Sequence, residues 1–351
     1  MPKFFAKLGG GISWFAALGI CAVSAAAQVR AEPVSFAGKT IILYVGVGEG
    51  AGAVDLLPRA LAPVLSRTLP GAPDVIVAQM PGAGGVTMAN FVEVAAPDDG
   101  TAWGFPPRTL VLAPLLGQTQ ARFDPMALNW IGSPSVSPSV AIVWAASTAV
   151  VSLADAARET VIVGATSPDQ DDSLLPRALN EVAGTKFKVI NGYRSPGEIE
   201  IAMEKGEVQG LVGTTFAALQ SGRAAEWLRQ GKARLIAQFG RSRDPALPDV
   251  PTAAETLSAD AEGLALIDYI LSANSMGYPA FVSSRVSSER VAAIREAYAK
   301  SVRDPEFVAR ITQMNIAPSP VTGEALAAIV RGIFLLPQSV RMRANALMLT
   351  K

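Results

Sequence analysis

Short runs of β-branched and other apolar residues alternate along this chain with longer stretches in which apolar positions recur every three or four residues. The run TIILYV at 40–45 predicts a first strand, and the apolar side chains of 54–68 fall on one face of a helix. Further strands are predicted at 74–80 and 101–105, with a helix around 86–95 between them. This alternation is typical of an α/β fold built on parallel strands.

A second α/β unit is predicted from AIVWAA at 141–146 onward. Strands at 161–166, 187–192 and 233–240 alternate with helical patterns. The helix after Ser195 has the clearest start, because the serine can cap it, a proline takes the first position and a glutamate completes a capping box. Amphipathic helices fill the C-terminal region.

Two α/β units followed by a returning helical segment predict two domains. Domain 1 is discontinuous and comprises 37–138 plus 242–351, and domain 2 is inserted as 139–241. In open α/β sheets, ligands bind outside the carboxyl ends of the strands. The sequence therefore predicts a binding cleft between the two domains.

Residues 1–31 have the three parts of an export signal, namely two early lysines, an apolar run at 12–26, and small residues before a cleavage site near Ala27 or Ala31. The apolar run is too short for a membrane-spanning helix, which needs about 18 residues or more. Cleavage would remove Cys21, the one cysteine of the chain. We therefore expect a periplasmic protein whose signal is cleaved and which has no thiol.

The composition excludes several classes of function. The chain has no histidine, which removes Ser-His and Cys-His nucleophile pairs, the commonest general base and most zinc sites. Its 30 basic and 30 acidic residues cancel, so no basic face indicates nucleic-acid binding. An exported hydrolase would need a carboxylate dyad or a metal, and the sequence offers no such constellation. We therefore expect no enzyme activity, no cofactor and no metal.

Two glycine-rich loops follow predicted strands, GVGEGA at 46–51 and PGAGG at 81–85. A dinucleotide site would need an acidic residue at the end of the second strand, but Gln79 and Met80 stand there. Amide groups at the start of a helix favour an anion, and a carboxylate fits this description as well as a phosphate. The alternative is that the glycines only permit tight turns.

Five segments follow one another in the order of a known family pattern. They are TLPGAPDVIVAQMPGAGGVTMANFVEVAAPDDGT (68–101), FDPMALNWIGS (123–133), GTKFKVINGY (184–193), AMEKGEVQG (202–210) and LPDVPTAAE (247–255). Together with the spacing of Asp55 and Arg59, this ordered set resembles the substrate-binding receptors of tripartite tricarboxylate transporters. The likeness extends from about residue 40 to the C-terminus.

The resemblance implies a bilobal periplasmic-binding-protein fold of the α/β class, with two α/β domains whose parallel-rich sheets are joined by hinge strands. It implies a monomeric, non-enzymatic receptor that closes on a small organic acid by gripping a carboxylate. The receptor would deliver this acid to the membrane permease subunits of a tripartite transporter. Neither a nucleic acid nor a cofactor takes part in such a function.

The resemblance also implies that two grip loops, Gly50 to Asp55 and Ala165 to Ser173, hold one carboxylate of the ligand. The PGAGG loop, Arg108 and Tyr193 would line the same cleft. The predicted ligand-binding residues are Gly50, Ala51, Gly52, Asp55, Gly82, Ala83, Gly84, Gly85, Arg108, Thr109, Ala165, Thr166, Ser167, Asp169, Ser173, Tyr193 and Thr214. Two of them have alternatives: Arg108 can form a structural ion pair, for example with Asp55, and Tyr193 can simply pack.

Acidic residues in both grip loops depart from the family pattern. Glu49 and the run Asp169, Asp171 and Asp172 bring negative charge near the expected anion, where like charges oppose a second carboxylate. Either these acids face solvent, or the ligand carries an amine as well as a carboxylate. Three alternatives to a transport receptor for an organic acid stay open: a ligand-sensing subunit for signalling, a diverged receptor for an amino-bearing acid, and a receptor that has lost tight binding.

Overall fold

The computed structural model describes residues 34–50, 53–115, 118–168, 170–220, 222–240, 242–257 and 260–349. The predicted export signal at 1–31 lies outside the described residues, as do three predicted ligand-binding residues, Ala51, Gly52 and Asp169. The expectations for these positions therefore stay predictions.

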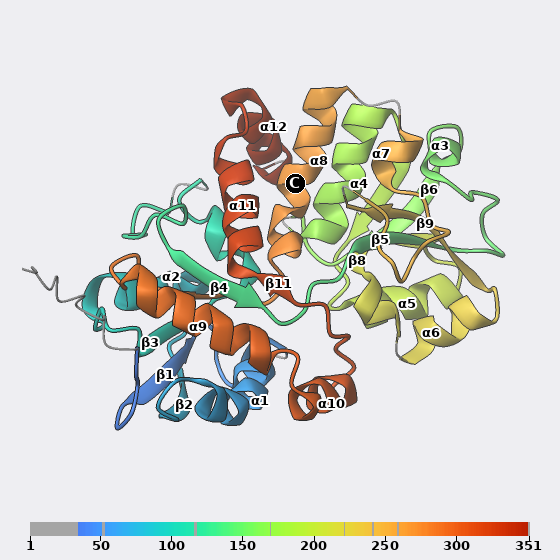
Figure 1. Ribbon diagram of the computed structural model, residues 1–351. Coiled ribbons are helices and arrows are strands. Elements are labelled where there is room, and N and C mark those ends of the chain that lie inside the picture. The colour runs from blue at the N-terminus through green and yellow to red at the C-terminus, as the bar shows by residue number, and fades with distance from the viewer. Residues whose placement is uncertain are drawn as a thin grey trace, which may run out of the picture. The chain divides into compact units, whose positions relative to one another are not determined.

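The described strands form two sheets, and each contains three neighbouring strands that run parallel (Figure 1). In the first sheet, β1 lies parallel between β2 and β3, while β10 pairs antiparallel with β3 and β4, and β11 with β4. This sheet has the order β11-β4-β10-β3-β1-β2, and its strands are β1 (Thr40–Val45), β2 (Asp74–Gln79), β3 (Ala102–Phe105), β4 (Asn129–Ser133), β10 (Ala280–Val282) and β11 (Val321–Thr322).

In the second sheet, β6 pairs parallel with β7 and β8, while β5 runs antiparallel to β8 and β9. The order is β7-β6-β8-β5-β9, and the strands are β5 (Ser139–Trp144), β6 (Val161–Ala165), β7 (Phe187–Asn191), β8 (Gly210–Thr215) and β9 (Ala233–Phe239). The predicted α/β class is confirmed. The hydrophobic pattern missed β4, β8, β10 and β11, because two of these strands have only two or three residues and the other two contain glycine.

Helices fill the connections between the strands. Their bounds are α1 (Ala53–Thr68), α2 (Val86–Asn90), α3 (Leu153–Ala156), α4 (Asp171–Ala183), α5 (Pro196–Glu204), α6 (Gly222–Arg229), α7 (Ala253–Thr256), α8 (Ala261–Met276), α9 (Ser288–Ser301), α10 (Pro305–Gln313), α11 (Gly323–Phe334) and α12 (Gln338–Leu349). A π-helical turn, Phe91–Ala95, continues α2, and a 3₁₀ turn, η3 (Arg108–Leu112), follows β3. The predicted helix after Ser195 is confirmed, with the Ser195 side chain accepting the Glu198 amide.

The first sheet is buried on both faces, and successive residues of its strands belong to opposite cores. On β4, Trp130 packs into the core that contains α11, whereas Ile131 packs into the core formed with α1 and α9. On β10, Phe281 joins Trp130 in an edge-to-face contact, with ring centroids 5.6 Å apart. This two-residue period follows from the alternation of side chains along a strand.

The second sheet is covered in the same way. Val212 of β8 packs with α4 and α8 on one face, and Leu211 packs with α5 and α6 on the other. Helix α8 contacts α4, α11 and α12 (Figure 1). The strands of the second sheet all come from 139–239, whereas α7 and α8, which the sequence assigns to domain 1, pack against β9 and α4. The exact domain boundary stays a prediction.

Asp55, in the first turn of α1, joins three elements of the first sheet. Its carboxylate accepts hydrogen bonds from the Gly50 amide (2.9 Å), Arg59 Nε (3.0 Å) and Gln79 Nε2 (2.6 Å), and the residue is only 2% exposed. Burial raises the pKa of Asp55, but these hydrogen bonds and the Arg59 charge outweigh burial, so the pKa lies below its ordinary value. The ionised side chain thus holds the loop after β1 against α1 and the end of β2.

Within the described residues, no single helix is both long and apolar enough to cross a bilayer, and only α11 taken together with α12, at a bend of 90°, meets that description.

Replacing Leu57 by alanine is expected to lower the free energy of unfolding by about 2–5 kcal/mol, because it empties volume in a closed core. Leu57 is 1% exposed, whereas its neighbour Leu56 is 40% exposed. Leu56→Ala is therefore the matched control and should cost less than about 0.5 kcal/mol. Urea denaturation measures both, and equal losses for the two variants would contradict the packing of α1.

Replacing Asp55 by asparagine is expected to lower the free energy of unfolding by about 1–3 kcal/mol at pH 7, because the amide cannot accept from all three donors. Since the folded-state pKa lies below the ordinary 3.8, this stabilisation is complete above 3.8 and is lost as the pH falls through the folded-state pKa. Denaturation series at several pH values should show wild type and variant converging in acid. Asp98→Asn, at an exposed position, is the control, and a pH-independent gap between wild type and Asp55→Asn would refute the assignment.

Candidate functional site

The described residues of the first grip loop already form hydrogen bonds and ion pairs with other residues of the protein. The Gly50 amide donates to Asp55, whose charge is balanced by Arg59. Glu49, by contrast, has an 84% exposed side chain with only a 3.8 Å ion pair to Arg59. Of the acids near this loop, one is therefore buried and neutralised, and the other faces solvent.

Glycine is required in the PGAGG loop because neighbouring loops approach it closely. Gly85 has a φ of 94°, and a Cβ there would lie 2.8 Å from Pro107 Cδ, in the segment that follows β3. A Cβ on Gly46, after β1, would in turn lie 3.1 Å from the Cα of Gly85. The loops after β1 and β2 thus approach each other backbone to backbone, and the Pro107 side chain after β3 packs against both. This favours the interpretation that the glycines permit tight turns, while Gly82, Ala83 and Gly84 stay exposed.

The second grip loop is tied down by an aspartate, as the first one is. Asp172 Oδ2 accepts from the Thr166 amide (2.9 Å) and from the Thr166 hydroxyl (2.8 Å). Two buried atoms here, Asp172 Oδ1 and Ser173 Oγ, have no hydrogen-bond partner among the described residues. Burial raises the pKa of Asp172, and the bonds from Thr166 offset this only in part.

Arg108 lies shortly after the end of β3, a strand of the first sheet. Its ion-pair partner is Asp171, which follows β6 of the second sheet. Arg108 Nη2 is 3.6 Å from Oδ2 of Asp171, the first residue of α4, and the two side chains are 37% and 25% exposed. Arg108 therefore pairs with Asp171, while Asp55 pairs with Arg59 instead. Burial raises the pKa of Asp171, the Arg108 charge and the Asn274 amide lower it, and the net change is upward.

A cavity of about 320 Å³ opens beside Arg108. It collects residues from the β4–β5 connection, from the end of β8 and from the segment between α8 and β10. Its polar lining residues are Arg108, Ser135, Ser137, Thr215, Asn274, Tyr278 and Asn315. The cavity therefore joins the carboxyl ends of strands from both sheets, as expected for a ligand site in this kind of fold.

Asn274 connects the wall of this cavity to the second sheet. Its Nδ2 donates to Ser139 Oγ of β5 at 2.7 Å, and the residue is 5% exposed. Its Oδ1 is buried without a hydrogen-bond partner in the described part of the chain. A buried acceptor left without a donor is uncommon in folded proteins and indicates a missing partner.

The other predicted residues lie at varying distances from this cavity. Thr109 is exposed next to Arg108, and Thr214 is buried in β8 just before Thr215. Ala165 ends β6 as a buried residue, and Ser167 is half-buried. Tyr193 lines a separate hollow with Arg194 and Glu198 and packs partly against the core under α5.

Sequence reasoning missed most of the residues around Arg108. Ser135 and Ser137 belong to the run SPSVSPS at 133–139, and this alternation of serine and proline between two predicted strands was a usable signal. Asn274 is one of several polar residues in the largely apolar helix α8 and lies near its end, which is a weaker signal. Thr215 and Tyr278 carry no local signal, because their role depends on which strands meet.

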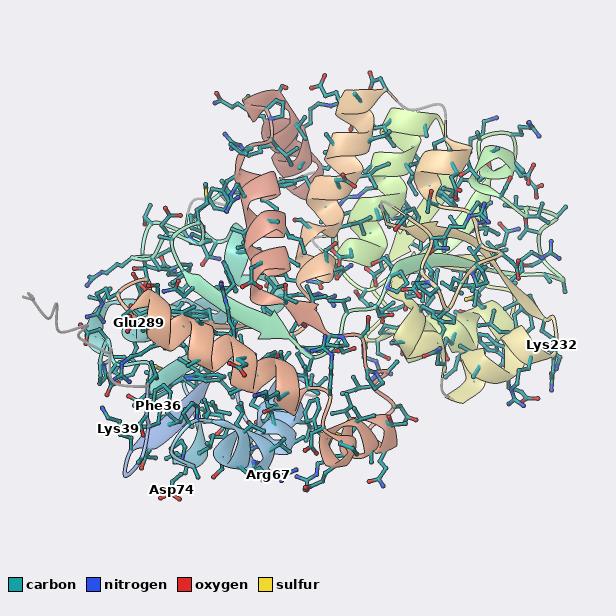
Figure 2. All side chains as sticks on the ribbon, in the orientation of Figure 1. Phe36, Lys39, Arg67, Asp74, Lys232 and Glu289 are labelled. Atoms are coloured by element: carbon teal, nitrogen blue, oxygen red, sulfur yellow. The ribbon has the colours of Figure 1, made fainter. Side chains whose placement is uncertain are left out.

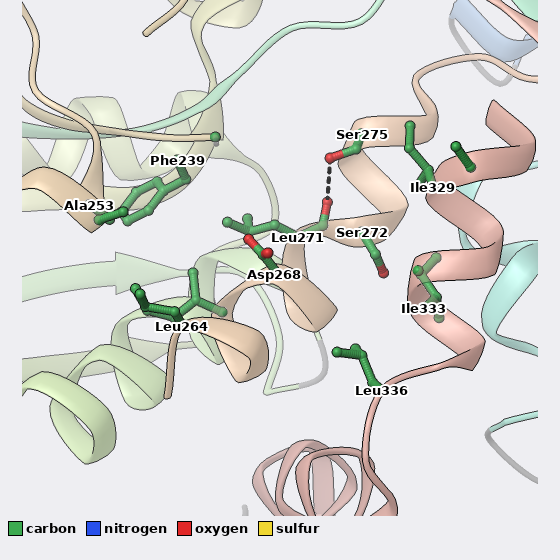
Figure 3. Close-up of a pocket in the computed structure, with 15 residues that line it drawn as sticks. Phe239, Ala253, Leu264, Asp268, Leu271, Ser272, Ser275, Ile329, Ile333 and Leu336 are labelled. Atoms are coloured by element: carbon green, nitrogen blue, oxygen red, sulfur yellow. Dashed lines mark hydrogen bonds between the residues drawn. The ribbon is translucent and has the colours of Figure 1, made fainter. Parts of the chain in front are cut away.

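A second cavity, of about 340 Å³, lies among α7, α8 and α11 (Figure 3). Figure 3 shows Leu264, Leu271, Ile329 and Ile333 around it. Neither lysine nor arginine occurs among the described residues that line it, so it offers no counter-charge to an acid. The cavity beside Arg108 is therefore the better candidate for an anionic ligand.

Comparison with known proteins places the chain in a family. The model of the tripartite tricarboxylate transporter family receptor matches residues 58–326. A UPF0065 protein of Cupriavidus necator is 30% identical over 251 residues, which cover 68% of this chain and 70% of that protein. A UPF0065 protein of Bordetella bronchiseptica is 28% identical, and the match covers 66% of each chain, just under two thirds of that protein's length.

Solved structures share the fold. A TctC solute-binding protein from Polaromonas has a TM-score of 0.68 at 19% identity, and the match covers 89% of this chain and 99% of that one. MatC from Rhodopseudomonas palustris, solved with bound malate, has a TM-score of 0.51 at 18% identity, with 88% and 98% covered. A further Rhodopseudomonas palustris protein, solved with adipate, has a TM-score of 0.54 at 16% identity, with 88% and 97% covered.

At these identities the structures establish the fold alone, whereas the family model covers most of the chain. The family is one of solute-binding receptors rather than enzymes. Because the matched segment runs from within α1 to within α11, it includes the second sheet, every strand of the first sheet except β1, and the cavity beside Arg108, and the chain belongs to the family of tripartite tricarboxylate transporter receptors.

Proposed function

We propose that this protein is a periplasmic receptor that binds a small organic acid in the cavity beside Arg108. The observation that carries the proposal is the Arg108 guanidinium, which donates no hydrogen bond to any described residue and stands 3.6 Å from its ion-pair partner. A guanidinium has five N–H donors in a planar fork that matches a carboxylate. Its donors are therefore available to a ligand.

The size and position of the cavity support the same proposal. About 320 Å³ is at the small end of ligand-binding clefts, which suits a metabolite rather than a macromolecule. Arg108 follows a strand of the first sheet, and Thr215 ends a strand of the second. A ligand that contacts both would favour a closed arrangement of the two lobes, and that arrangement would dock on the membrane subunits of the transporter.

The ligands bound in similar structures indicate which compounds to include in a binding screen of candidate ligands, called the panel below. Malate and adipate are bound in two of the similar structures, so dicarboxylates belong in the panel beside mono- and tricarboxylates and amino acids. The predicted ligand-binding residues of the grip loops form part of this proposal, with Asp55 and Asp172 as loop anchors rather than direct ligands. A signalling subunit would use the same cavity, and no feature of the described residues favours that alternative.

Arg108→Ala is expected to abolish the stabilisation that the cognate acid confers. A ligand at 100 times its Kd adds about 2.7 kcal/mol to the free energy of unfolding, which corresponds to about 5 °C in Tm. Thermal unfolding with the panel measures this for wild type and variant. Arg122→Ala, at an exposed arginine outside the cavity, is the control. An undiminished ligand shift in Arg108→Ala would refute the site.

The export proposal has a direct test of its own. Protein recovered from the periplasmic fraction should have the intact mass of a chain that begins at Gln28 or Glu32, because the signal would be cleaved after Ala27 or Ala31. Mass spectrometry of the two cell fractions checks this. A full-length mass found only in the cytoplasmic fraction would contradict periplasmic function.

A further inference from the structure

Acceptor groups lie beside Arg108, the one cation among the described residues that line the cavity. Asp171 Oδ2 lies 3.6 Å from Arg108 Nη2. Asn274 lines the cavity, and its side-chain amide lowers the pKa of the same Asp171 carboxyl. Asn274 Oδ1 and Asp172 Oδ1 are buried without hydrogen-bond partners among the described residues, and their side chains belong to residues that are 5% and 8% exposed. Carboxylate and amide oxygens can only accept hydrogen bonds. This cluster therefore lacks donors.

The charges around Arg108 do not suit a dicarboxylate. One guanidinium stands against the carboxylate of Asp171, Asp172 is next to Asp171 in the sequence, and Arg108 is the only charged residue among the described residues that line the cavity. A dicarboxylate would bring two further negative charges to these acids, and like charges at such distances repel. A ligand with one ammonium and one carboxylate would add no net charge.

An ammonium group supplies what the cluster lacks. It carries a positive charge and three N–H donors, which can serve Asp171 and the free oxygen of Asn274 at the same time. The short separation between Arg108 and Asp171 requires that the ligand's two charged groups also lie close together. An α-amino acid meets this requirement, because it carries both groups on one carbon atom. The ligand would then lie with its charges antiparallel to the protein's own ion pair.

We propose, on the basis of the function proposed above, that the bound acid is a small neutral α-amino acid. Its carboxylate binds Arg108, its ammonium binds Asp171 and Asn274 Oδ1, and its side chain occupies the rest of the cavity. That remainder is lined by Ser135, Ser137 and other neutral residues, both polar and apolar. Because no second cation occurs among the described residues that line the cavity, an acidic side chain would have no oppositely charged partner among them.

The test compares ligands that differ only in the amino group. L-Alanine and L-serine are titrated into the exported protein by calorimetry beside lactate, which has a hydroxyl in place of the amine of alanine, and beside malate and adipate. The amino acids should bind at least tenfold more tightly than lactate and the dicarboxylates. Asp171→Asn should lose at least tenfold in affinity for the amino acids and should narrow the gap to lactate.

Two further variants make the outcome specific. Asp74→Asn, at an exposed position on the edge strand β2 (Figure 2), is the matched control and should bind as wild type does. Asn274→Ala removes the free acceptor while keeping Asp171, and should weaken amino acids but not lactate. If Asp171→Asn fails to fold, as judged by circular dichroism, Asn274→Ala decides the question.

The possible results separate this inference from the proposed function. Binding of lactate, malate or adipate as tightly as the amino acids, with dependence on Arg108, would overturn the inference and leave an organic-acid receptor. Unchanged amino-acid affinity in Asp171→Asn would also overturn the inference. Absence of binding by every amino acid and carboxylate tested would overturn both proposals.

Discussion

A buried aspartate near the start of a helix ties down the loop that precedes it, and this interaction occurs once beside each sheet. Asp55 holds the Gly50 amide at the start of α1, and Asp172 holds the Thr166 amide at the start of α4. The free N–H groups and the dipole at a helix N-terminus favour a carboxylate there. Each aspartate thereby sets where its helix begins relative to the strand before it.

The position of the candidate site follows from the second of these anchors. Because Asp172 fixes the first turn of α4, its neighbour Asp171 is held 3.6 Å from Arg108, which lines the cavity. Arg108 is positioned independently, by the packing of Pro107 against Gly85 at the ends of β2 and β3. The ion pair therefore joins two strand ends that are far apart in the sequence.

The structure also distinguishes the acids that the sequence grouped together. Glu49 extends into solvent, whereas Asp171 and Asp172 are largely removed from it and have raised pKa values because of burial. The two explanations offered for the acidic residues therefore concern different members of the set. Exposure to solvent accounts for Glu49, and a ligand that carries a donor is what we propose for Asp171.

The sequence alone determined the fold class, the family and most of the long strands, because side-chain periodicity and turn residues are local properties. It placed Arg108 at a strand end and identified the helix after Ser195 from its cap. It could not find β10 and β11, which are too short to show a period. Nor could it show that Asp171 rather than Asp55 faces Arg108, or that Asn274 and Thr215 share a cavity with it. Those contacts join residues separated by tens of positions or more, and only the packing of two sheets and their helices brings them together.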